Sequence, residues 1–105
     1  MEKLTKENYK EKLSGVCVVE ISGEGCANCL SLMPVLYELC KNREDCRLVH
    51  IEADETITEL LEELNVQTAP TILIMKDGEE KARCKGYQPE EILEVWLDAK
   101  IKEIQ

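Results

Sequence analysis

The sequence lacks any long apolar run. A membrane-spanning helix needs about 18–20 consecutive apolar residues, and no stretch of this 105-residue chain approaches that length. Residues 1–7 also lack the apolar core of a secretory signal peptide. We therefore expect a cytosolic protein with no membrane partner.

The chain is also short of positive charge. Thirteen lysines and arginines stand against 22 aspartates and glutamates, which gives a net charge of −9. This charge repels the phosphates of nucleic acids and acidic lipid surfaces, so we expect no nucleic acid partner and favour basic protein partners. No repeat, low-complexity segment or composition shift marks a linker, so residues 1–105 are predicted to form one domain.

The spacing of apolar residues predicts alternating helices and strands. Helices are expected at 5–13, 27–42, 57–64 and 89–99, and strands at 16–21, 47–52, 71–75 and 80–85. Asp77-Gly78 is typical of a tight hairpin turn between the last two strands. With no strand pattern before Thr5, the order α-β-α-β-α-β-β-α predicts an α/β fold with a mixed four-stranded sheet flanked by helices.

Two of these helices carry specific start signals. Thr56 and Glu59 have the spacing of a capping box, which would open a helix with Ile57, Leu60, Leu61 and Leu64 facing inward. Pro89 is expected in the first turn of the final helix, whose apolar residues are expected to be Ile92, Val95, Trp96 and Ala99.

The most informative motif is Cys26-Ala27-Asn28-Cys29, at the start of the second helix. Residues three apart on a helix have Cβ atoms about 5–6 Å apart. A disulfide needs about 3.5–4.5 Å, so a small adjustment of the first turn opens or closes the bond. The positive end of the helix favours the thiolate of Cys26, which is therefore the expected nucleophile. Structural zinc is the rival interpretation, but no second close pair of Cys or His supplies the remaining ligands.

Four further cysteines need an assignment. Cys40 and Cys46 flank the polar segment 41–45 and are either a second disulfide, or regulatory pair, or two free thiols. Cys17 alternates with Val19 and Ile21, which indicates a small core residue. The absent leader and strong periodicity favour a reduced compartment over a secreted disulfide scaffold.

Taken together, the motifs resemble the thioredoxin family over nearly the whole chain. They are Cys26-x-x-Cys29, Pro34, Ala69-Pro70-Thr71, Asp77-Gly78 and Gly86. The resemblance implies that Pro70 is cis and lies against the cysteine pair, where the backbone of Ala69 would receive a substrate strand. It also places Cys84 on the active-site side. The chain departs from thioredoxin itself at Gly25, where the family usually has Trp, and at Ala27-Asn28, where it has Gly-Pro.

The resemblance implies a thiol-disulfide oxidoreductase that reduces protein disulfides. Cys26 would attack the substrate, Cys29 would resolve the mixed disulfide, and Glu20, which matches a buried family acid, would take the proton of Cys29. His50 matches a family lysine and is either a proton relay or an ordinary packed residue.

Apart from the redox-active disulfide Cys26–Cys29, no cofactor is expected. A separate reductase would donate electrons to a monomer. Because residues 14–39 contain no Lys, Arg or His, we expect a reductant rather than a strong oxidant. The alternative is a redox-inactive or metal-binding interaction module with the same fold.

Overall fold

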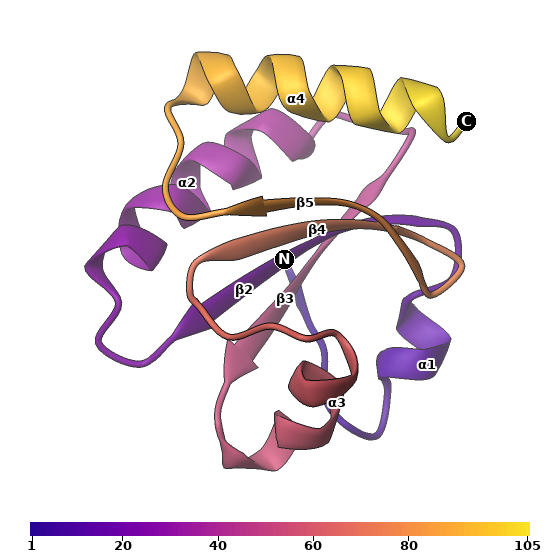
Figure 1. The fold of residues 1–105 in the computed structure, drawn as a ribbon. Helices are drawn as coiled ribbons and strands as arrows, with labels where there is room; N and C mark the ends of the chain where they lie inside the picture. The colour runs from indigo at the N-terminus through magenta and orange to yellow at the C-terminus, as the bar shows by residue number, and fades with distance from the viewer.

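A five-stranded mixed sheet runs through the middle of the computed structural model, which describes residues 1–105 (Figure 1). Its spatial order is β1-β3-β2-β4-β5. The strands are β1 (Glu2–Lys3), β2 (Val16–Gly23), β3 (Arg47–Ala53), β4 (Thr71–Lys76) and β5 (Glu79–Lys85). Strands β1, β3 and β2 are parallel, whereas β4 is antiparallel to β2 and β5 is antiparallel to β4.

Helices cover both faces of the sheet. They are α1 (Tyr9–Lys12), α2 (Ala27–Cys40), the short 3₁₀ helix η1 (Glu55–Ile57), α3 (Thr58–Glu63) and α4 (Glu90–Glu103). Helices α2 and α4 lie together on one face, and α1 and α3 lie on the other (Figure 1). None of these helices has the length and hydropathy needed to cross a membrane.

The central strand β2 divides the core into two layers. Cys17, Val19 and Ile21 pack on the α1/α3 face, and Val18 packs on the α2/α4 face. Since side chains alternate along a strand, Glu20 and Ser22 point to the same face as Val18. This alternation places a carboxylate and a hydroxyl in the layer beneath α2.

The prediction of four strands is wrong, because β1 adds a fifth. Glu2 and Lys3 pair in parallel with Val49 and His50, and the N–H of Leu4 donates to the carbonyl of His50 at 2.7 Å. Two residues are too few to show an alternating pattern, so only pairing with β3 reveals this strand. The first helix is shorter than expected, since residues 6–8 form turns before α1 begins.

The expected capping box at Thr56 is also wrong. Asp54 is the capping residue, because its Oδ1 accepts the N–H of Thr56 at 2.8 Å and η1 begins between them. Aspartate is among the best N-cap residues, and Asp54 comes two residues before Thr56, so the helical segment begins earlier than expected.

The expected apolar face of the last helix is wrong except at Trp96, which packs against the core. Pro89 is the residue before α4 rather than part of its first turn. Ile92 and Val95 are 56% and 70% exposed. The buried stripe is Leu93, Leu97 and Ile101. Both stripes have helical spacing, so packing against α2 decides between them.

The hairpin prediction at Asp77-Gly78 is confirmed. Both residues have positive φ, 51° and 82°, as the two-residue turn that suits twisted strands requires. Asp77 also ties this turn to the start of β2, because its Oδ1 accepts the N–H of Gly15 at 2.7 Å and its own N–H donates to the carbonyl of Gly15 at 2.9 Å.

Candidate active site

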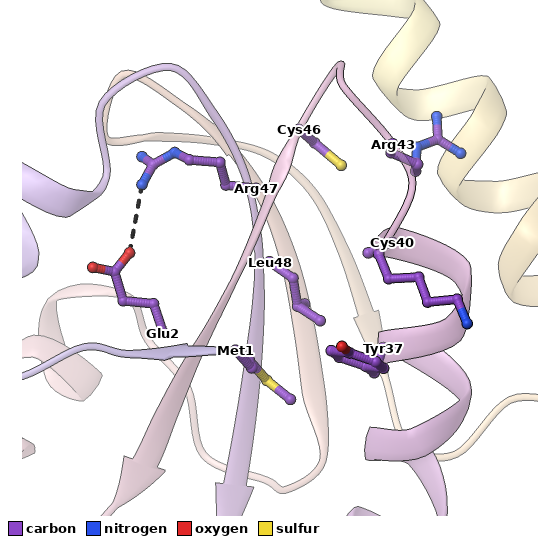
Figure 2. A pocket seen from close by; sticks show the side chains of 9 residues that line it. Met1, Glu2, Tyr37, Cys40, Arg43, Cys46, Arg47 and Leu48 are labelled. Carbon is purple, nitrogen blue, oxygen red and sulfur yellow. Dashed lines mark ion pairs between the residues drawn. The ribbon is translucent and has the colours of Figure 1, made fainter.

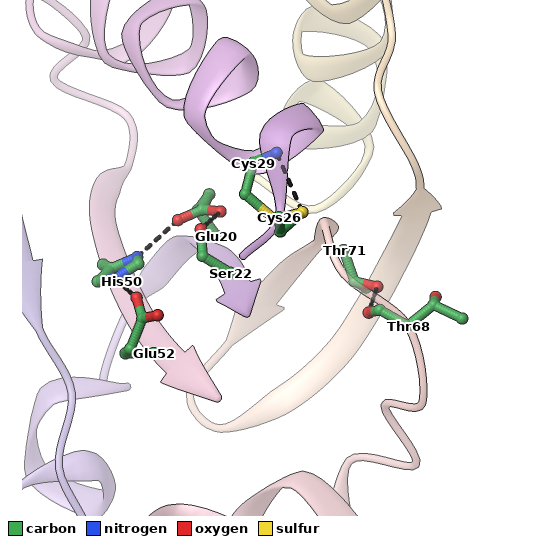
Figure 3. The surroundings of a disulfide bond; sticks show 8 residues. All are labelled: Glu20, Ser22, Cys26, Cys29, His50, Glu52, Thr68 and Thr71. Atoms are coloured by element: carbon green, nitrogen blue, oxygen red, sulfur yellow. Dashed lines mark hydrogen bonds and ion pairs between the residues drawn. A yellow bond between two sulfur atoms is a disulfide. The ribbon is translucent and has the colours of Figure 1, made fainter. Parts of the chain in front are cut away.

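The two cysteines of the motif lie at the point where β2 leads into α2. Cys26 is the N-cap of α2, and Cys29 lies in its first turn. Gly25, with φ at 72°, turns the chain into this position without the strain a side chain would add. Cys26 and Cys29 are joined by a disulfide, with Cα atoms 5.3 Å apart (Figure 3).

The two sulfurs have different surroundings. Cys26 is partly exposed, whereas Cys29 is only 2% exposed and packs under the helix. The Sγ of Cys26 accepts the backbone N–H of Cys29 at 3.2 Å (Figure 3). A donor at a helix N-terminus lowers the free energy of a thiolate relative to the thiol. Cys26 therefore combines access with anion stabilisation, and Cys29 has neither.

The loop before β4 reaches the same end of the sheet. The Ala69–Pro70 bond is cis, as the family resemblance implies. Ala69 is exposed and lies beside Gly23, the last residue of β2. The carbonyl of Pro70 accepts the N–H of Gly86 at 2.8 Å, and the hydroxyl of Thr71 donates to the carbonyl of Thr68 at 2.7 Å.

A pocket of about 200 Å³ opens beside the disulfide. Its lining comprises Ser22, Gly23, Glu24, Gly25, Cys26, Cys29, Leu30, Met33 and Glu52. The charged residues among them, Glu24 and Glu52, are both acidic. This pocket brings both cysteines together with Gly25.

A buried carboxylate lies next to the cysteine pair. Glu20 is fully buried, and Figure 3 shows its side chain between His50 and Cys29. Its Oε2 accepts the hydroxyl of Ser22 at 2.5 Å, and its Oε1 lies 2.6 Å from the Nδ1 of His50. Glu20 and His50 are direct partners across the parallel pair β2–β3, which explains the contact.

His50 lies between two carboxylates. Its other ring nitrogen, Nε2, is 3.1 Å from Glu52 Oε2. The hydrogen bond with Glu20 is the main cause that raises the pKa of His50, partial burial opposes it, and Glu52 adds to the rise. An imidazolium donates from both nitrogens and so satisfies both acids.

A family model described as Thioredoxin matches residues 1–99 of the chain. The chain belongs to the thioredoxin family. It is 35% identical to Thioredoxin H3 of Arabidopsis thaliana over 92 residues, which cover 88% of this chain and 75% of that protein. It is 32% identical to the thioredoxin of Bacillus subtilis over 94 residues, which cover 88% of this chain and 89% of that protein.

Solved thioredoxin structures share the fold. Thioredoxin f2 of Chlamydomonas reinhardtii has a TM-score of 0.83 at 21% identity and covers 96% of this chain and 97% of its own. The short form of spinach chloroplast thioredoxin f has a TM-score of 0.82 at 18% identity, over 93% and 91% of the two chains.

Membership in the thioredoxin family makes the chain a thiol-disulfide oxidoreductase, with the Cys26–Cys29 disulfide as its redox-active group. Thioredoxins reduce protein disulfides, are recycled by a reductase and need no bound cofactor.

Sequence reasoning missed two members of this thioredoxin site, Ser22 and Glu52. Each lies two residues beyond a predicted site residue, Glu20 on β2 and His50 on β3. The period of two along a strand is the signal that would have found them, since it keeps such pairs on one face.

The lone cysteines, Cys17 and Cys84, do not line the pocket beside the disulfide. Cys17 is fully buried in the α1/α3 layer, so the prediction of a core residue is confirmed, and burial raises the pKa of its thiol. Cys84 on β5 pairs with Ile72, two residues beyond Pro70, and burial raises the pKa of its thiol too. No cluster of three or more His, Cys, Asp or Glu side chains is placed to hold a metal ion.

Proposed function

We propose that residues 1–105, acting as one domain and one monomer, reduce disulfides in target proteins with Cys26 as the attacking thiol and Cys29 as the resolving thiol. The contrast between the two sulfurs carries this assignment. Cys26 is accessible and accepts a helix N–H at 3.2 Å, whereas Cys29 is 2% exposed and is reached only from within the molecule.

The reaction proceeds in two exchanges. The Cys26 thiolate attacks one sulfur of the target disulfide, a mixed disulfide forms, and the other target sulfur leaves as a thiolate that takes a proton. Cys29 then loses its proton and attacks the sulfur of Cys26. This step closes the Cys26–Cys29 disulfide and releases the second target thiol. Two electrons and two protons pass to the target, and a separate reductase restores them.

Glu20 is the proposed acceptor of the Cys29 proton. Its carboxylate is buried beside the pair and is hydrogen-bonded to Ser22 and His50. His50, when protonated, places positive charge on one side, and Glu52, which also lines the pocket, contacts the ring at 3.1 Å. A Glu20→Gln variant should form mixed disulfides at the normal rate but release them slowly, because only the second exchange needs the proton acceptor.

The proposed substrate groove comprises Gly25, Ala69 and Pro70. Gly25 leaves open the space that Trp fills in typical thioredoxins, and Ala69 is exposed at the same end of the sheet. The acidic Glu24 and Glu52 and the net charge of −9 favour basic target segments. A cytosolic location stays a prediction from the sequence.

We further propose that the protein acts as a reductant. No Lys, Arg or His lines the pocket beside the disulfide, so backbone N–H groups stabilise the thiolate there, while the lining carboxylates of Glu24 and Glu52 oppose it. The potential should lie nearer to the value of about −270 mV of thioredoxin than to the value of about −120 mV of strongly oxidising relatives. Equilibration with a glutathione buffer measures this potential.

Trapping tests the assignment of the thiols. A Cys29→Ser variant should hold target proteins as mixed disulfides, whereas a Cys26→Ser variant should hold none and should not accelerate insulin reduction by dithiothreitol. Cys84→Ser is the matched control, since it removes a half-buried thiol that does not line the pocket beside the disulfide, and this variant should reduce insulin like the unaltered protein. Equal trapping by both single variants of the pair would contradict the separate roles of attacking and resolving thiol.

A further inference from the structure

A second pair of cysteines meets at the opposite end of α2. Cys40 is the last residue of this helix, and Cys46 comes directly before β3. The five residues between them turn the chain back, with the N–H of Arg43 donating to the carbonyl of Cys40 at 3.0 Å. In Figure 2 the sulfur of Cys46 points toward the end of α2, where Cys40 lies. The fold therefore brings two thiols together that the sequence leaves unassigned.

The two thiols interact, and the interaction makes them unequal. Cys46 is the main cause that raises the pKa of Cys40, and Cys40 is the main cause that lowers the pKa of Cys46. Arg43 also lowers the pKa of Cys46, against burial and the charge of Asp45. Cys46 is thus the better nucleophile of the two.

Although these cysteines are only 5% and 9% exposed, they border open space. A surface pocket of about 340 Å³ is lined by Met1, Glu2, Tyr37, Cys40, Lys41, Arg43, Cys46, Arg47 and Leu48 (Figure 2). A small molecule in this pocket would contact the edge of the thiol pair. Neither lone cysteine, Cys17 or Cys84, lines any pocket in the structure.

The charge of this pocket is opposite to that of the pocket at the active site. Lys41, Arg43 and Arg47 line it with a single carboxylate, Glu2. The cations are held in place by ion pairs, Arg43 with Asp45 and Asp98, Lys41 with Glu38, and Arg47 with Glu2 at 3.7 Å. In a chain with net charge −9, the side chains that line this pocket carry more positive than negative charge, which favours an anionic ligand over a cationic one.

We propose that Cys40 and Cys46 are a second redox centre, which small anionic disulfides oxidise to an internal disulfide at this pocket. The Cys46 thiolate attacks one sulfur of the small disulfide, and one thiolate leaves and takes a proton. Cys40 then gives up its proton and attacks Cys46, which closes the Cys40–Cys46 bond and releases the second thiol. The small disulfide gains two electrons and two protons, and the protein loses them.

Oxidised glutathione is the probe for the test. A Cys26→Ser/Cys29→Ser parent variant removes the first pair and leaves four of the six cysteines. After incubation, acid quenching and alkylation, mass spectrometry should find two thiols lost and a cross-link joining Cys40 to Cys46. Cys17 and Cys84 serve as internal controls: both should stay free thiols during the incubation and should therefore be alkylated at the end.

Two further variants of this parent separate the roles of the sulfurs. With Cys40→Ser added, glutathione should stay attached to Cys46. With Cys46→Ser added, Cys40 should gain no glutathione in the same time. The proposal is overturned if the parent keeps four free thiols under oxidation that fully closes Cys26–Cys29 in the unaltered protein, or if glutathione stays on Cys46 while Cys40 is present. Because the parent alone decides between these outcomes, a variant that fails to fold does not leave the question open.

Discussion

The pairing of Glu20 with His50 makes a quantitative prediction about stability. Glu20 is fully buried, and its only cationic partner is His50, whose Nδ1 lies 2.6 Å away. Removing one member of a buried ion pair costs about 3–5 kcal/mol, because the other charge is left unpaired. The His50 side chain is 13% exposed, so water can enter where the ring was. We therefore expect His50→Leu to destabilise the protein by about 3 kcal/mol, the lower end of that range.

Removing the carboxylate instead should cost much less. Glu20→Leu takes away the buried charge itself, and the His50 that remains still has Glu52 at 3.1 Å. Replacing both members by leucine should give a protein within about 1 kcal/mol of the original, or one more stable, since apolar replacements of buried pairs are often neutral or stabilising. Urea unfolding of the fully oxidised proteins measures these differences. With a slope of about 1.5 kcal/mol per molar, His50→Leu should lower the midpoint by about 2 M.

The dependence on pH gives an independent check. Glu20 raises the pKa of His50 in the folded protein above the ordinary value of about 6.5. The ion pair therefore makes its full contribution to the free energy of unfolding at a pH below that ordinary value. This contribution is lost as the pH rises through the raised pKa of His50. The difference in free energy of unfolding between the original protein and His50→Leu should therefore become smaller toward alkaline pH. The ion pair as described would be refuted if His50→Leu and Glu20→Leu destabilised the protein equally. It would also be refuted if the destabilisation by His50→Leu increased with pH.

Three other outcomes are expected. Leu32 on α2 is fully buried, and Leu32→Ala should lower the free energy of unfolding by about 2–5 kcal/mol. Leu30 on the same helix is 74% exposed, so Leu30→Ala should change this free energy little. Thermal melting compares the two variants. Asp77→Ala loses the bond from the Gly15 N–H and should cost about 1 kcal/mol in urea unfolding. Reduction of a basic disulfide peptide should outpace that of an acidic one, and raising the salt concentration above about 0.1 M should shrink this ratio in a stopped-flow assay. A ratio indifferent to salt would count against electrostatic selection of targets.

Much of this molecule could be predicted from local patterns. The motif Cys26-x-x-Cys29 after an apolar run and before a helix placed the active site, and Asp77-Gly78 fixed the antiparallel hairpin. These features are local, because a few neighbouring residues set both the backbone angles and the packing. The cis bond before Pro70 came from family resemblance, since only about 5–6% of such bonds are cis in folded proteins.

The failures share a physical cause, which is dependence on residues far away in the chain. Strand β1 exists only because β3 offers it partners. Packing against α2 determines which face of α4 is buried, because two apolar stripes on α4 have helical spacing. The meeting of Cys40 and Cys46 at one pocket depends on how segment 41–45 folds back, and that polar segment carries no periodic pattern.

The borders of the sheet have a consequence for handling the protein. Strand β1 is two residues long, and the outer strand β5 carries exposed charges of both signs at Glu79, Glu80, Lys81 and Lys85. Neither border offers a long, flat, apolar template on which another chain can add a strand. We expect concentrated samples to form no fibrils even when they are oxidised and reduced repeatedly. Opening or closing a disulfide at either end of α2 leaves the edge strands β1 and β5 unchanged.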